Sequence, residues 1–174
     1  MIFKKKNGFT LIELIIVVAI LAIISTLALP YFHEIMAQQE MKKIIYKLTS
    51  SIQLAKSHAA IEHRNVVICP SSDHLNCQTN KWSSGFISFV DNNKNKQVDR
   101  DEKIIFIEST NLKYGNLDWR GTLSTPSLTF QAENGLPRGF NGSFYYCSTL
   151  YVQKHQRIIL SPMGHTRTEK PSYC

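Results

Sequence analysis

The hydrophobic positions divide the chain into three stretches with different periodicities. Residues 11–29 are almost continuously apolar, and a helix over residues 10–29 would be about 30 Å long, enough to cross the hydrocarbon core of a membrane. Further along, apolar residues recur at steps of four, four, three and four, which is typical of a helix with one buried face: Ile44, Leu48, Ile52, Ala55 and Ala59. From residue 64 onward the apolar runs are short, as in strands.

The first two stretches predict one long N-terminal helix. Pro30 should kink this helix or sit at a bend, and the helix should then continue to about Glu62. The last apolar positions of the buried face, Ala55 and Ala59, are small, so a sheet could approach that end of the helix closely. Lysines at positions 42, 43, 47 and 56 fall largely off this face and indicate a solvated side of the helix.

The third stretch predicts an antiparallel sheet. Clusters of glycine, proline or asparagine separate several of its apolar runs. Helices do not alternate with these runs, so a parallel sheet is not expected. The predicted fold class is α+β, with the long N-terminal helix packed on antiparallel strands at 66–68, 86–90, 103–107, 127–130, 143–146, 150–152 and 157–160.

Four cysteines follow the apolar segment. In an exported domain they predict two disulfides, for which three pairings are possible. Cys69 and Cys77 are close enough to close a small loop, which leaves Cys147 to pair with Cys174. A zinc site built from Cys69, His74 and Cys77 is the alternative, although such a site would be unusual outside the cytoplasm.

The residues before and within the apolar segment carry a specific motif. A basic lead, Lys4–Lys6, precedes Gly8, and a single carboxylate, Glu13, lies near the start of the apolar run, where an isolated charge usually has a partner. This arrangement closely resembles the class III signal of type IV pilins and type II secretion pseudopilins. The resemblance implies that a prepilin peptidase cuts after Gly8 and methylates the new N-terminus at Phe9.

The resemblance also implies how the chain is organised and where it works. Glu13 would offer a buried partner to the terminal amine of a neighbouring subunit, and breaking such a pair costs about 3–5 kcal/mol. The alternative is a carboxylate that snorkels to the interface of a plain signal anchor. The expected parts are a leader (1–8), a transmembrane and filament-core helix (9–30), an amphipathic continuation (31–63) and a β-rich head (64–174).

The same resemblance gives expected locations and partners. The subunit would cross the bacterial inner membrane once, with a periplasmic head, and would then enter an extracellular pilus. Its partners would be other major and minor pilins, together with the prepilin peptidase.

The middle of the chain is similar to one branch of this family. A cysteine-bearing strand, a W-x-x-G motif and a strand ending in D-x-N follow the helix in the order found in FimT/GspH minor pilins and pseudopilins. The matching residues are Val67-Ile68-Cys69, Cys77, Trp82, Gly85, Phe89 and Asp91-Asn92-Asn93. This resemblance implies the type IV pilin fold and a minor component of the filament.

One polar segment has the spacing of a calcium loop. Lys96 stands where the sharp turn of such a loop needs glycine, and the predicted flanks are strands rather than the helices of an EF-hand. A polar turn between two strands is therefore the preferred interpretation, and we expect no metal and no cofactor. The residues concerned are Asp91, Asn93, Asn95, Asp99 and Glu102.

Charge is distributed unevenly along the chain. Removing Lys4–Lys6 lowers the formal net charge from +7 to +4. From Asn111 onward there are seven Lys/Arg against three Asp/Glu, so this part carries the whole remaining excess. A basic C-terminal loop after Leu160 would suit contacts to phosphate more than sequence reading.

That loop resembles a motif of FimT-type minor pilins. In those proteins a C-terminal glycine-arginine-x-arginine binds DNA during natural transformation. Here the segment is Gly164-His165-Thr166-Arg167, so a histidine, mostly neutral at pH 7, replaces the first arginine. The predicted DNA-binding residues are Arg167, His165, Lys170, Gly164, Lys154 and Arg157, with Tyr145, Tyr146 and Tyr151 nearby. The alternative is a solvated basic hairpin tip without a polyanion partner.

Three classes of function follow. The first is a minor pilin that binds extracellular DNA without sequence preference for uptake in natural transformation. The second is a structural minor pilin, or a GspH-like secretion pseudopilin, that helps to initiate or cap filament assembly. The third is an enzyme, for which the sequence has none of the G-x-S-x-G, H-E-x-x-H or phosphate-binding glycine motifs, so no catalytic residues are predicted.

Overall fold

The computed structural model describes residues 9–174 of the 174-residue chain. Gly8 and Lys4–Lys6, which carry part of the predicted processing signal, lie outside the described residues. The chain begins with helix α1 (Leu11–Glu62), which is one helix through Pro30. The contacts between residues divide the whole chain into two units. The first unit ends at Met36, and the second runs from Ala37 to Cys174.

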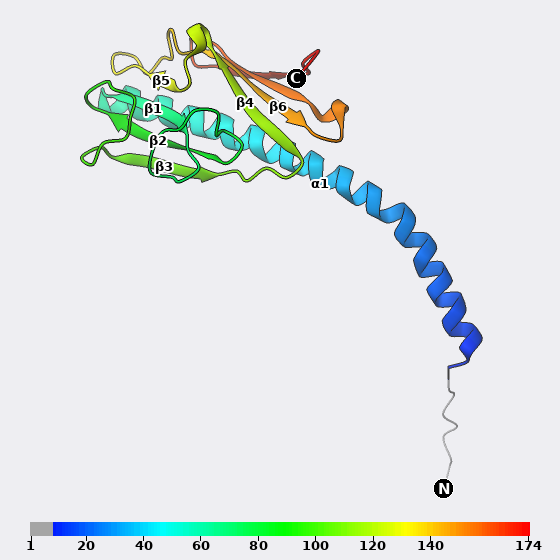
Figure 1. Ribbon diagram of the computed structural model, residues 1–174. Helices are drawn as coiled ribbons and strands as arrows, with labels where there is room; N and C mark the ends of the chain where they lie inside the picture. The colour runs from blue at the N-terminus through cyan, green and yellow to red at the C-terminus, as the bar shows by residue number, and fades with distance from the viewer. Residues whose placement is uncertain (1–8) are drawn as a thin grey trace. The chain divides into compact units, whose positions relative to one another are not determined.

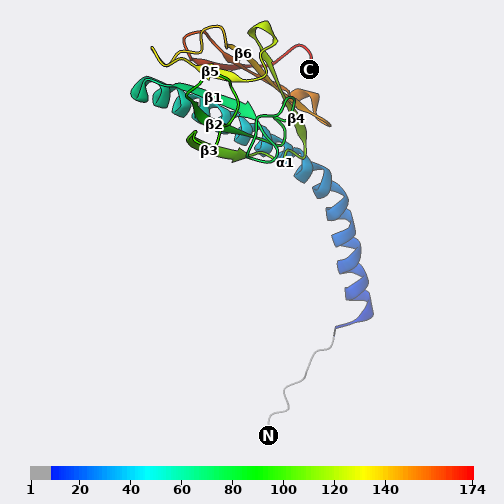
Figure 2. The same cartoon turned by 60° about the vertical axis from the view of Figure 1, so that its left-hand side comes forward.

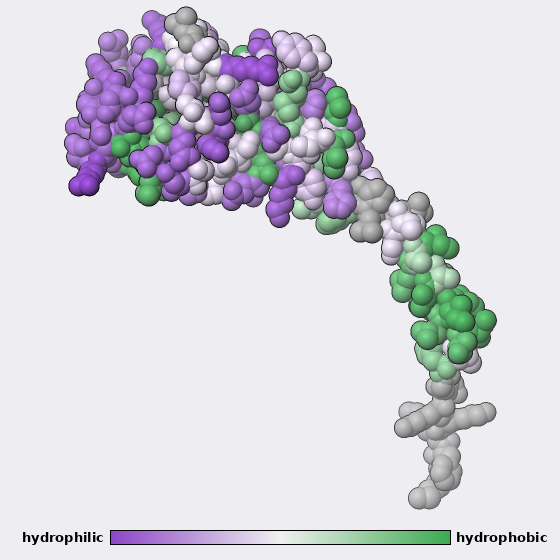
Figure 3. All heavy atoms as spheres, in the orientation of Figure 1, coloured by the Kyte–Doolittle hydropathy of each residue, from purple (hydrophilic) through white to green (hydrophobic). Residues whose placement is uncertain are grey.

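From Leu11 to Ile24 the large apolar side chains of the first unit are exposed in the single subunit. Figure 3 shows apolar residues over this part, in contrast to the hydrophilic surface of the head on the face shown. Within residues 9–174, α1 is the one helix long and apolar enough to span a membrane. At its start the Thr10 hydroxyl accepts the Glu13 N–H, and the Glu13 carboxylate accepts the Thr10 N–H, which is a capping box.

The second unit combines the rest of α1 with two four-stranded antiparallel sheets (Figures 1 and 2). Sheet A has the order β3-β2-β1-β5 and sheet B the order β4-β6-β7-β8. Short 3₁₀ helices, η1 (Thr122–Ser124) and η2 (Val152–Lys154), lie between strands. The strands are β1 (Asn65–Pro70), β2 (Gly85–Asp91), β3 (Ile104–Ser109), β4 (Gly115–Gly121), β5 (Leu128–Phe130), β6 (Gly142–Ser148), β7 (Gln156–Leu160) and β8 (Thr166–Glu169).

One hydrophobic core joins α1 to both sheets. The predicted stripe on α1, from Ile44 to Ala59, is buried against the inward side chains of the two sheets. Alternate residues of each strand face this core because side chains of a strand point to opposite sides. The sheets contribute Val66, Ile68, Phe86, Leu128 and Phe130 from one side and Leu117, Trp119, Phe144, Tyr146, Ile158 and Leu160 from the other.

Glu40 links α1 to sheet B. Its carboxylate accepts hydrogen bonds from the backbone N–H groups of Lys113 and Tyr114 and from the Tyr146 hydroxyl, at 2.7, 3.1 and 2.9 Å. Burial, followed by the interaction with this carboxylate, raises the pKa of Tyr146 above its ordinary value.

The two disulfides join Cys69 to Cys77 and Cys147 to Cys174. The second unit therefore contains both disulfides and the whole described core, which are the requirements for an independently folding domain.

The structure corrects parts of the predicted secondary structure. Residues 150–152 are not a strand: Leu150 and Tyr151 lie in a loop, and Val152 begins η2. Lys154 lies in that helix and not on β7. Two strands were not predicted, β4 and β8. The second of these means that the basic segment after Gly164 is a sheet edge rather than a mobile loop.

Candidate functional site

The outer face of sheet B, the side turned away from the core, carries polar side chains from four strands, and three of these strands contribute charged ones. The register aligns Arg120 with Ser143, Ile159 and Arg167 in one row across the sheet. The neighbouring row aligns Asp118, Tyr145, Arg157 and Glu169. Because adjacent strands lie about 4.8 Å apart, these side chains form one continuous surface.

Tyr145 lies between two arginines on this surface. The guanidinium carbon of Arg120 is 4.1 Å from the centre of its ring and that of Arg157 is 5.4 Å away. Arg157 also donates to the Ser143 hydroxyl at 3.0 Å and to Glu169 at 2.9 Å, so its orientation is fixed. The arrangement presents guanidinium planes of set orientation, which is the geometry that favours contacts to phosphates and bases.

A groove of about 520 Å³ lies beside this row, at the β7–β8 hairpin. Its charged side chains are Arg157 and Arg167, and none of the described residues that line it is acidic. Arg167 is exposed and has no hydrogen bond or ion pair to any residue from 9 to 174, so its guanidinium remains available to a ligand. The polar lining is completed by Asn141, Ser143, Ser161, His165 and Thr166.

Gly164 shapes the hairpin that carries this groove. Its φ of +74° belongs to the left-handed region, and a Cβ atom there would meet the Lys56 side chain at 3.0 Å. Lys56 donates from Nζ to the Met163 carbonyl at 3.0 Å, which ties the hairpin to α1. The positive φ therefore favours glycine at this turn, and a side chain there would have to displace the flexible end of Lys56.

A second, smaller pocket of about 100 Å³ is also lined by Arg157. The C-terminal tail forms much of it, and the disulfide from Cys174 to Cys147 fixes that tail to β6. The pocket is lined by Tyr145, Arg157, Glu169, Lys170, Pro171, Ser172 and Tyr173.

The structure places five of the six predicted DNA-binding residues around these two hollows and leaves one outside. Arg157, His165 and Arg167 line the groove, Gly164 forms its turn, and Lys170 lies in the smaller pocket. Lys154 is absent from both linings, and its Nζ donates to Gln38 of α1 at 3.4 Å.

The three tyrosines expected nearby have different positions. Tyr145 faces the outer surface, whereas Tyr146 points into the core. Tyr151 precedes η2. Sequence reasoning missed Arg120, although the alternation of apolar and charged residues from Leu117 to Arg120 is the signal of a half-buried strand.

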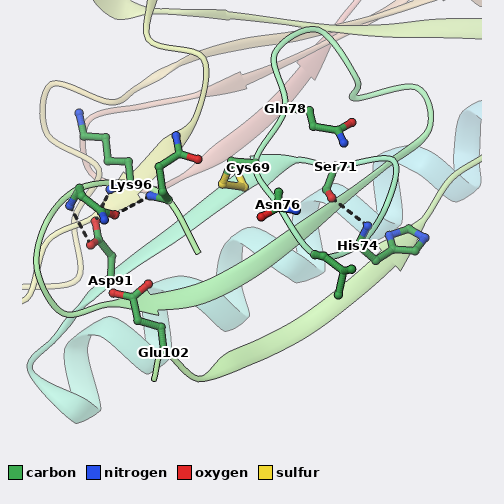
Figure 4. Close-up of a disulfide and its surroundings, with 12 residues drawn as sticks. Cys69, Ser71, His74, Asn76, Gln78, Asp91, Lys96 and Glu102 are labelled. Carbon is green, nitrogen blue, oxygen red and sulfur yellow. Dashed lines mark hydrogen bonds between the residues drawn. A yellow bond between two sulfur atoms is a disulfide. The ribbon is translucent and has the colours of Figure 1, made fainter. Parts of the chain in front are cut away.

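In the loop region of sheet A, residues 71–84 and 91–103, the carboxylates accept hydrogen bonds from the backbone of their own loops (Figure 4). Asp91 accepts the backbone N–H groups of Asn95 and Lys96, each at 3.1 Å. Glu102 accepts those of Asn92 and Asp99 at 2.8 and 3.2 Å. Both carboxylates are buried, and their hydrogen bonds hold a turn in which Lys96 takes a left-handed φ of 60°.

The first part of this region is similarly self-contained. Asp73 accepts hydrogen bonds from the backbone N–H groups of Asn76 and Leu75, and these bonds lower the pKa of its carboxyl. The zinc alternative is wrong in this structure, because the sulfur atoms of Cys69 and Cys77 are bonded to each other. Among residues 9–174, no three His, Cys, Asp or Glu side chains are grouped to hold a metal ion.

Comparisons with known protein families match most of the chain. The model of the type II transport protein GspH family matches residues 46–164, and that of the prokaryotic N-terminal methylation motif matches residues 3–29. The chain is also similar to the fimbrial protein EcpB of Eikenella corrodens, with 39% identity over 70 residues, and to a fimbrial protein of Pseudomonas aeruginosa, with 34% over 64 residues. These matches cover 40% and 37% of this chain and 43% and 41% of those relatives.

Solved structures show the same fold. The type IV minor pilin FimU of Pseudomonas aeruginosa superimposes with a TM-score of 0.56 at 17% identity, covering 78% of this chain and 96% of the FimU chain. A second crystal form of FimU gives a TM-score of 0.50 at 18% identity, covering 76% of this chain and 98% of that chain. The long helix and the antiparallel sheets are therefore the type IV pilin fold, as predicted.

Proposed function

The chain belongs to the GspH family of type IV pilin-like proteins, and we propose that it is a minor pilin that binds extracellular DNA for uptake in natural transformation. The N-terminal methylation motif and the apolar helix are consistent with anchoring in the inner membrane, processing by the prepilin peptidase and association with other pilins. The proposal adds DNA binding to these family properties and places the DNA in the groove at the β7–β8 hairpin.

The observation that carries this step is the chemistry of the groove. Two arginines, a histidine and several hydroxyl or amide donors face a hollow without a lining carboxylate among the described residues. Phosphate diesters need such donors and are repelled by carboxylates. The contacts would be to the backbone, so binding would be independent of sequence and sensitive to salt.

The affinity of one subunit would be modest. Only a few cations reach the groove, so the dissociation constant would be micromolar or weaker at physiological salt. Several subunits along one filament could raise the overall affinity by avidity.

The test is a salt titration of duplex DNA binding to residues 37–174. The Arg167→Gln, Lys170→Gln double variant should bind at least about tenfold more weakly, and its slope of log affinity against log salt should be shallower by about two. Lys42→Gln, Lys43→Gln is the matched control, because it removes two exposed charges from α1. Equal losses in both variants, or no binding at low salt, would contradict DNA binding by the groove and by Lys170 of the neighbouring pocket.

The family match itself favours a second candidate, an assembly component that contacts only other pilins. Glu13 is expected to act in assembly under either proposal, but it also forms the capping box with Thr10.

Two variants of Glu13 separate its charge from its hydrogen bond. Glu13→Gln keeps a hydrogen-bond acceptor at this position and removes the charge, whereas Glu13→Ala removes both. If charge pairing drives assembly, both variants should insert into membranes yet be depleted from sheared pili. Normal incorporation of Glu13→Gln would refute the pairing.

A further inference from the structure

We propose that the pocket formed by the C-terminal tail binds an unpaired base, so that the site prefers single-stranded to double-stranded DNA. This inference rests on the proposed function and names the form of its ligand. The phosphates would occupy the groove at the β7–β8 hairpin, and a neighbouring base would enter the pocket that contains Tyr173.

The two hollows differ in charge. The groove is lined by Arg157 and Arg167 and by no carboxylate among the described residues. The pocket is lined by Lys170 and by Glu169, which accepts a hydrogen bond from Arg157 at 2.9 Å. A carboxylate repels a phosphate, but it can accept a hydrogen bond from the amino group of a base. The pocket therefore suits a base and the groove suits the backbone.

Tyr173 provides an aromatic surface for that base. Its side chain is 70% exposed, and it makes no hydrogen bond or ring contact with any residue between 9 and 174. The adjacent Cys174 is covalently bonded to Cys147, so the backbone beside this exposed ring is held in place. A backbone that is already restrained loses less conformational entropy when the ring it carries stacks on a ligand.

Arg157 connects the two hollows because its side chain lines both of them. A strand that crosses Arg157 could place a phosphate on one side and the adjoining base on the other. In a duplex the bases are stacked and paired inside the helix, so a duplex could use the groove but not the ring of Tyr173. Unpaired DNA would use both.

The test compares an oligonucleotide of about 12 nucleotides with its duplex, each binding to residues 37–174, by fluorescence anisotropy at one salt concentration. The wild type should bind the single strand at least about fivefold more tightly than the duplex. Tyr173→Leu should weaken single-strand binding by about 5- to 100-fold and change duplex binding by less than about twofold. Tyr46→Leu is the matched control, since Tyr46 is an equally exposed tyrosine on α1.

The outcomes separate this inference from the proposed function. If Arg167→Gln weakens binding of both forms while Tyr173→Leu behaves like Tyr46→Leu, the groove binds DNA and the base pocket is refuted. Equal affinity of the wild type for the two forms would also overturn the preference. If neither form binds the wild type, the proposed function and this inference both fail.

Discussion

The loop region of sheet A and the outer face of sheet B both carry many charged side chains, but those side chains have different partners. Around Asp91 and Glu102 the carboxylates accept backbone N–H groups of their own loop. On the outer face of sheet B, Arg167 and Lys170 are exposed and have no polar partner among residues 9–174.

This difference distinguishes polar groups that hold a fold from polar groups that can hold a ligand. A buried carboxylate with its acceptors filled contributes to stability, and removing it leaves backbone donors without partners. An exposed arginine contributes little to stability and remains available to an anion. The sequence offered a ligand site both in the calcium-like spacing at Asp91 and in the basic motif at Gly164, but the structure gives them these two different surroundings.

The largest effects are expected from the disulfides, one of which belongs to each region. The Cys147–Cys174 bond spans 27 positions and the Cys69–Cys77 bond spans 8, so loop-closure entropy assigns them about 3.5 and 2.5 kcal/mol of stability. Urea unfolding of residues 37–174 should therefore show a larger loss for Cys147→Ala, Cys174→Ala than for Cys69→Ala, Cys77→Ala. The reverse order would show that loop closure is not the main contribution.

Asp91 should give the next largest effect. Asp91→Ala removes an acceptor from two backbone N–H groups, of which that of Asn95 keeps the Asn93 side chain as a second acceptor. The variant should lower the free energy of unfolding by about 2 kcal/mol, without altering DNA affinity. Asp101→Ala, an exposed change in the same loop, should alter stability by less than about 0.5 kcal/mol. Similar stability of the two variants in urea unfolding would contradict the structural role of Asp91.

Much of this molecule could be predicted from local patterns. The apolar run, the stripe from Ile44 to Ala59 and most strands of the core have periodicities that depend only on which side of an element is buried. The fold class and the disulfide pairing followed from those elements and the cysteine spacing.

The site was harder to predict because it depends on strand pairing. β8 is only four residues long and has no apolar stripe, so its sequence does not mark it as a strand. Without β4 and β8 the alignment of Arg120 with Arg167 across the sheet could not be seen. The ion pair between Arg157 and Glu169 likewise depends on the pairing of β7 with β8, because the two residues are not close in sequence.

The smallest effect concerns Tyr146, a β6 residue whose side chain faces the core and is fully buried. Its raised pKa means that the folded state keeps the hydroxyl protonated at a pH where the unfolded state ionises it. The Tyr146 hydroxyl therefore makes its full contribution to the free energy of unfolding below about pH 10. That contribution falls as the pH rises further, by up to about 1.4 kcal/mol per pH unit. Tyr146→Phe should be about 1 kcal/mol less stable at pH 8 and should lose less stability between pH 10 and 11. Parallel pH profiles in urea unfolding would contradict this assignment.

The most direct test of the contrast between the two regions is an NMR titration of ¹⁵N-labelled residues 37–174 with a single-stranded oligonucleotide of about 12 nucleotides. The proposal predicts that the largest amide shift changes fall at the β7–β8 hairpin and along the C-terminal tail, while the loop region of sheet A keeps its shifts. Changes centred on residues 91–103 or on α1, or the absence of any change at low salt, would contradict it.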